Sequence, residues 1–124
     1  MNQSAFASRY ATNKHRQALY EELLGYLDMV KRYLSLYCLV VFGSFISDKE
    51  LPNDVDLILH GHVRNDMLGT FNVETFRSQG KLHIKLEISA MKQDFDLRTS
   101  AELVHWFEDS NAGKKVGAYE VVDF

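Results

Sequence analysis

The chain has 124 residues, of which 46% are hydrophobic and 25% charged, and its formal net charge is −3. This length gives room for one hydrophobic core, so we expect a single domain over residues 1–124. The negative charge argues against a DNA-binding protein, the lack of a long apolar run or leader pattern argues against a membrane protein, and the single cysteine favours a cytoplasmic location.

Hydrophobic periodicity predicts helices that alternate with strands. Apolar residues recur at helical spacing in an N-terminal helix at about residues 14–34, and strict alternation over 82–89 indicates a strand with one apolar face. The other expected elements are strands at 37–42, 55–60 and 118–122, a helix at 66–78, and a helix from Thr99 or Ser100 through Phe107. We therefore expect an α/β (α+β) fold, with a mixed β-sheet flanked by helices and one sheet face partly open.

Two short motifs lie next to apolar runs. Gly43 and Ser44 follow the run that ends at Phe42, and Asp54 and Asp56 lie in a second run further along the chain. Side chains two residues apart on a strand point to the same side, so we expect the two carboxylates to project together. A divalent cation would relieve their repulsion, and oxygen ligands favour Mg²⁺ or Mn²⁺.

The Gly-Ser motif suits phosphate binding. Glycine lets a backbone come close to a phosphate, and Ser44 offers a hydroxyl and an N–H group. Gly-Ser and Asp-x-Asp each occur alone in ordinary turns, but their order and their apolar flanks favour a nucleotide site. Lys49, Lys85, Lys114 and Lys115 are either triphosphate contacts or solvated surface lysines.

The motif Gly43-Ser44, a short spacer and Asp54-Val55-Asp56 between apolar residues resembles the signature of the DNA polymerase beta-like nucleotidyltransferase superfamily. The resemblance is closest to its minimal nucleotidyltransferases, among small, poorly characterised bacterial proteins, over about residues 38–60. A weaker similarity extends through the segment 113–117 to the C-terminus. The resemblance implies the nucleotidyltransferase fold, binding of an NTP such as ATP, and a Mg²⁺ or Mn²⁺ cofactor.

The superfamily usually has a third carboxylate on a later strand, and Leu86-Glu87-Ile88 fits that place. The resemblance thus implies metal ligands at Asp54, Asp56 and Glu87, with a glutamate where the family more often has an aspartate. Asp96 is a rival for the third acid. Three histidines can also lie near the acids: His60, His62 and His83. No pair of them has the helical spacing of a zinc site.

The resemblance implies an enzyme that moves an NMP from an NTP to a hydroxyl of a protein or RNA acceptor. Asp54 and Asp56 would hold two metals, Ser44 would position phosphates, and Glu87 would help to deprotonate the acceptor. Such small proteins often act on a partner, sometimes in toxin–antitoxin or phage-defence systems, so we expect a partner protein or a homodimer. The alternative is a catalytically weak or inactive module of the same fold that binds and regulates a partner.

Overall fold

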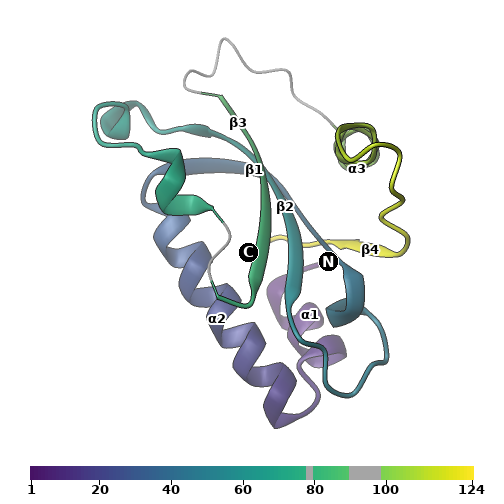
Figure 1. The fold of residues 1–124 in the computed structure, drawn as a ribbon. Helices are drawn as coiled ribbons and strands as arrows, with labels where there is room; N and C mark the ends of the chain where they lie inside the picture. Colours follow the sequence, from purple (N-terminus) through teal and green to yellow (C-terminus); the bar gives the residue numbers. More distant parts are fainter. Residues whose placement is uncertain (78–79, 90–98) are drawn as a thin grey trace.

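A mixed four-stranded β-sheet forms the centre of the computed structural model, which describes residues 1–77, 80–89 and 99–124 (Figure 1). Its strands are β1 (Leu34–Phe42), β2 (Val55–Val63), β3 (Leu82–Ser89) and β4 (Tyr119–Val121). They lie in the order β3-β2-β1-β4. β1 is antiparallel to β2 and β4, whereas β2 and β3 are parallel. The predicted α/β (α+β) fold with a mixed sheet is confirmed.

The strands follow the alternation of apolar side chains. β3 has the bounds that the alternation over 82–89 predicts. β1 begins before the predicted residue 37 and β2 ends after the predicted residue 60, because the two strands continue to pair as far as Leu34 and Val63. A bulge in β1 lies opposite Gly61, where an added Cβ would come within 2.5 Å of the Ser35 carbonyl oxygen. The hairpin therefore needs a glycine at this point.

In the described part of the chain, three α-helices flank the sheet: α1 (Gln3–Tyr10), α2 (Lys14–Lys31) and α3 (Ser100–Ser110). α2 is the helix predicted at 14–34, and it ends earlier because β1 begins at Leu34. α3 begins as predicted, since Thr99 is its N-cap and forms a capping box with Glu102. α1 was not predicted. None of the described helices is both long and apolar enough to cross a membrane.

The predicted helix at 66–78 is wrong. The described part of this segment forms two short 3-10 helices, Asn65–Met67 and Val73–Phe76, instead of one α-helix. Gly69 lowers helix propensity between them. Asn72 then accepts a hydrogen bond from the Glu74 N–H, so its side chain starts the second short helix.

The two faces of the sheet are covered differently. α1 and α2 cover one face, where Phe6, Leu23 and Leu57 belong to the larger buried core. α3 covers part of the opposite face, where Leu103 packs in a smaller cluster with Ile58. That smaller cluster takes residues from β1, β2 and β4, and none from the described residues of β3. The β2–β3 side of this face is where the polar residues of the candidate site lie.

Candidate functional site

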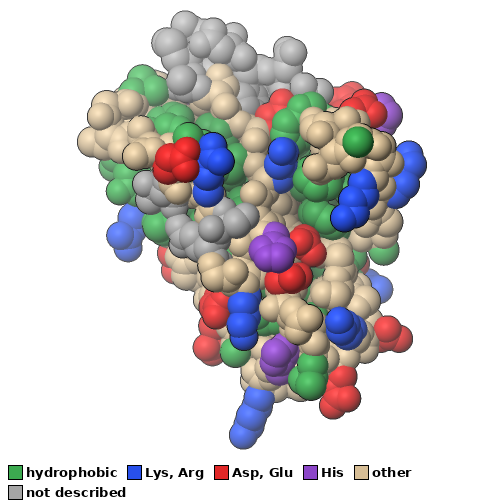
Figure 2. Space-filling model, viewed as in Figure 1, with side chains coloured by type: hydrophobic (Ala, Val, Ile, Leu, Met, Phe, Trp, Pro, Cys, Tyr) green, Lys and Arg blue, Asp and Glu red, His purple; other side chains and the backbone are tan. Residues whose placement is uncertain are grey.

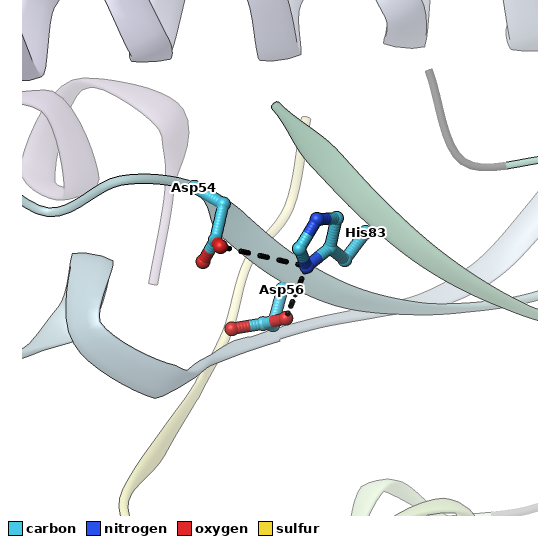
Figure 3. Close-up of side chains that lie close together, drawn as sticks. All are labelled: Asp54, Asp56 and His83. Atoms are coloured by element: carbon cyan, nitrogen blue, oxygen red, sulfur yellow. Dashed lines mark ion pairs between the residues drawn. The ribbon is translucent and has the colours of Figure 1, made fainter. Parts of the chain in front are cut away.

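Asp54 and Asp56 lie at the start of β2. Asp54 directly precedes the strand and Asp56 is its second residue. Their side chains are 29% and 26% exposed and project to the same side of the strand (Figure 3). The two-residue strand spacing predicted this arrangement, and the structure confirms it.

His83 of β3 lies against both carboxylates. The parallel register pairs His83 with Asp56, which brings the imidazole to the same side as the acids. Its Nδ1 atom is 3.4 Å from Asp56 Oδ1 and 3.6 Å from Asp54 Oδ2 (Figure 3). One ligand atom from each of the three residues lies within 4.8 Å of the others. Figure 2 shows a histidine beside acidic side chains on the open surface near the middle of this view.

Glu87 is not brought to the aspartates. The register pairs it with His60, four residues further along both strands than the Asp56–His83 pair. At about 3.3 Å per residue, this places the two pairs roughly 13 Å apart along the sheet. Among the described residues, His83 and not Glu87 is the third metal-ligating side chain beside the two aspartates. The rival residue, Asp96, lies outside the described residues.

Of the three histidines, only His83 joins the acids. His60 is fully buried, with its ring centroid 6.1 Å from that of Tyr37. His62 lies further along β2, its ring centroid 5.2 Å from that of the same tyrosine. Among the described residues, no group of three metal-ligating side chains other than the Asp54, Asp56 and His83 cluster was found.

Gly43 places the end of β1 directly against Asp56. It begins a 3-10 turn, Gly43–Ile46, with φ at +79°, a value that side-chain-bearing residues rarely adopt. A Cβ added at Gly43 would overlap Asp56 Oδ2 and come within 3.2 Å of its Cγ. The bare glycine thus makes room for the Asp56 carboxylate. Ser44 follows in the same turn and is half-buried.

The charges around Asp56 act in opposite directions. Burial raises the pKa of the Asp56 carboxyl, and the neighbouring Asp54 carboxylate raises it further. His83 and Lys114 lower it, so the Lys114 ammonium is near enough to act on this site. The Lys49 side chain is exposed in the loop that follows the 3-10 turn. A partly buried carboxylate pair with one imidazole beside it is a donor set that fits a divalent cation.

Sequence reasoning missed Arg16, a buried residue of α2 that contacts the loop between Ser44 and Lys49. A signal was available in the sequence. Arg16 lies three residues before Leu19 and seven before Leu23, so it falls on the apolar stripe of the helix. A charged residue on such a stripe must find polar partners inside the protein.

Comparison with known proteins finds one family. The model of a family described as "Family of unknown function (DUF6932)" matches residues 1–122. No curated protein matches the chain. No solved structure matches it either.

Proposed function

Because the chain belongs to DUF6932, a family of unknown function, we propose its function from the site: it is a metal-dependent nucleotidyltransferase. Its substrate would be an NTP, and its acceptor a hydroxyl of a protein or RNA. The observation that carries this proposal is the cluster of Asp54, Asp56 and His83 beside the Gly43–Ile46 turn. The sequence resemblance to minimal nucleotidyltransferases supports the same reading.

The donor set supports a divalent cation and favours Mn²⁺ over Mg²⁺. Asp54 and Asp56 repel each other, and partial burial adds to the free-energy cost of ionising Asp56. A bound cation would offset both effects. Mg²⁺ is bound in proteins mainly by oxygen ligands, whereas His83 offers a nitrogen, which transition-metal ions accept more readily.

Each residue of the site has a role in this proposal. Asp54, Asp56 and His83 would hold the metal, which would neutralise charge on the triphosphate. Ser44 would donate a hydrogen bond to a phosphate oxygen, and Lys114 would add a positive charge beside it. The acceptor oxygen would bond to the α-phosphorus as the bond to the departing pyrophosphate breaks. The metal would also polarise the acceptor hydroxyl, and the hydroxyl proton would pass to solvent.

One observation favours the alternative, a module that binds a nucleotide without turning it over. Among the described residues, Glu87 does not supply the third carboxylate that the resemblance implies, since it pairs with His60 further along the sheet. Binding and transfer must therefore be measured separately.

The test uses NTPs labelled at the α-phosphate or at the γ-phosphate, with Mn²⁺ or Mg²⁺ and a cell lysate. Nucleotidyl transfer puts the α-label, and not the γ-label, on a protein or RNA. The double variant Asp54→Asn, Asp56→Asn should abolish labelling, whereas Asp28→Asn, an exposed aspartate of α2, should retain it. Metal-dependent NTP binding without labelling would support the binding module. NTP affinity that is equal with and without metal would contradict both the nucleotidyltransferase and the metal-dependent binding module.

A further inference from the structure

The first turn of α2 holds the loop that joins the two halves of the site. This loop runs from Ser44, inside the Gly43–Ile46 turn, to Asn53, which directly precedes Asp54. Asn13, the N-cap of α2, donates from Nδ2 to the Glu50 carbonyl at 2.9 Å. The His15 ring nitrogen Nε2 lies 2.5 Å from the Pro52 carbonyl oxygen. Arg16 makes the remaining contacts.

Arg16 directs its whole guanidinium at backbone carbonyls. The side chain is 3% exposed. Its donors reach the carbonyl oxygens of Phe45 at 2.5 Å, Lys49 at 2.6 Å and Ser47 at 2.7 Å. Longer bonds reach Tyr10 at 3.1 Å and Ser44 at 3.5 Å. The guanidinium carbon also lies 5.2 Å from the centre of the Phe45 ring.

These bonds decide which groups the loop can offer to an anion. A carbonyl oxygen is a partial negative charge, and several of them facing a phosphate would repel it. Arg16 donates hydrogen bonds to the carbonyl oxygens of Ser44, Phe45, Ser47 and Lys49, so these oxygens face α2. The planar guanidinium fixes the relative positions of these acceptors, which a lysine with one ammonium group could not do.

We propose that Arg16 is the positioning residue for nucleotide phosphates at this site. By holding the carbonyls of Ser44, Phe45, Ser47 and Lys49, it keeps Ser44 where a phosphate would lie with the metal on Asp54, Asp56 and His83. The inference rests on the proposed function, and it adds an element to the site: α2 sets the phosphate side, while β2 and β3 set the metal side. Arg16 itself does not touch the nucleotide.

The test compares Mn²⁺ binding with NTP binding in Arg16→Lys. Mn²⁺ without nucleotide should bind within about twofold of the parent, because the three metal ligands do not contact Arg16. The NTP–Mn²⁺ complex should bind about tenfold more weakly, the loss expected when a phosphate loses one hydrogen bond to a well-placed donor. Mn²⁺ is followed by electron paramagnetic resonance, and the nucleotide by calorimetry.

A matched control separates positioning from loss of stability. Tyr26 lies on the same helix, is equally buried, and donates from its hydroxyl to the Phe76 carbonyl at 2.7 Å, outside the loop. Tyr26→Phe should lower Tm and leave NTP affinity within about twofold. If Tyr26→Phe weakens NTP binding as much as Arg16→Lys does at an equal loss of Tm, Arg16 is only a structural residue.

Asn13→Asp gives a second variant should Arg16→Lys not fold. An aspartate still accepts the N-cap hydrogen bond from the Arg16 N–H, but it cannot donate to Glu50. NTP affinity should fall about threefold at an unchanged affinity for Mn²⁺. If the folded variants bind NTP–Mn²⁺ like the parent, the positioning role is wrong although the proposed function stands. If the parent protein binds no NTP, the proposed function fails first.

Discussion

At the scale of single residues, the site concentrates charge in a place that disfavours it. Asp56 is partly buried beside Asp54, and both conditions raise its pKa. A raised pKa means that the folded state binds a proton more tightly than the unfolded state does. Between the unfolded pKa of about 3.9 and the higher folded value, stability therefore falls as the pH rises. The two ionised carboxylates therefore destabilise the folded protein, and a bound cation would remove this destabilisation.

Asp56→Asn should therefore raise the stability of the metal-free protein. In EDTA at pH 7, we expect a Tm above that of the parent, because the variant has no charge to desolvate and none to face Asp54. The advantage should shrink as the pH falls from the raised folded pKa of Asp56 toward the unfolded value of about 3.9, because Asp56 of the parent takes up a proton over this range. Thermal unfolding followed by circular dichroism at several pH values checks this.

The control for this experiment is Asp28→Asn, which changes the same formal charge on an exposed part of α2. It should leave Tm nearly unchanged. A parent protein that is more stable than Asp56→Asn at pH 7 in EDTA would show that the interaction with His83 outweighs burial and repulsion.

Gly43→Ala should damage metal binding through contact with Asp56. Any residue other than glycine at a φ of +79° costs roughly 1–2 kcal/mol of stability. At Gly43 the new methyl group would also overlap the Asp56 carboxylate. Displacing this ligand should weaken Mn²⁺ binding by about tenfold or more, the scale seen when support of a metal ligand is lost.

Gly117→Ala is the matched control, because Gly117 has a φ of +74° and no atom within 4 Å of the added Cβ. It should lower Tm by a similar amount and leave Mn²⁺ affinity unchanged. Calorimetric titration of both variants with Mn²⁺ makes the comparison. Equal affinities in the two variants would mean that Asp56 moves aside without consequence.

At the scale of elements, the sequence predicted those whose side-chain pattern is strong. The alternation from Leu82 to Ser89 gave both ends of β3, and the regular leucines of α2 gave its start. α1 was not predicted because only Phe6 and Tyr10 of its eight residues are buried. Two buried residues are too few to give a recognisable helical pattern of apolar side chains. The segment after β2 has a helix-like spacing of apolar residues, but Gly69 and the turn chemistry of Asn72 prevail over it.

The relative placement of the candidate-site side chains was predicted where it depends on neighbours in sequence, and not where it depends on strand register. Asp54 and Asp56 are two residues apart, so the strand itself fixes their relation. His83 and Glu87 lie on the same face of β3, and only the register with β2 decides which of them meets Asp56. That register is set by the crossover connection and by packing against the core, and neither leaves a local mark in the sequence.

At the scale of the whole molecule, the two faces of the sheet differ: one is packed against helices, and the other carries the candidate site. α1 and α2 bury one face, where the larger hydrophobic core lies. The other face carries α3 over its middle and the cluster of Asp54, Asp56 and His83 at the start of β2 and β3. Phe42, Asp56 and His83 pair in one row across three strands, with Tyr119 next to Phe42 on β4. Residues of all four strands therefore lie in one row through the candidate site.

The parallel pairing of β2 with β3 also bears on the order of folding. β1 and β2 are neighbours in the chain and form an antiparallel hairpin, whereas β3 reaches β2 only after a crossover. Contacts that close a longer loop tend to form later, because their entropic cost is larger. His83 would then join the aspartates after the folding transition state.

Mn²⁺ at ten times its Kd should slow unfolding about tenfold and leave the refolding rate unchanged. Stopped-flow measurements in Mn²⁺ and in EDTA check this, and faster refolding in Mn²⁺ would place β3 in the folding nucleus.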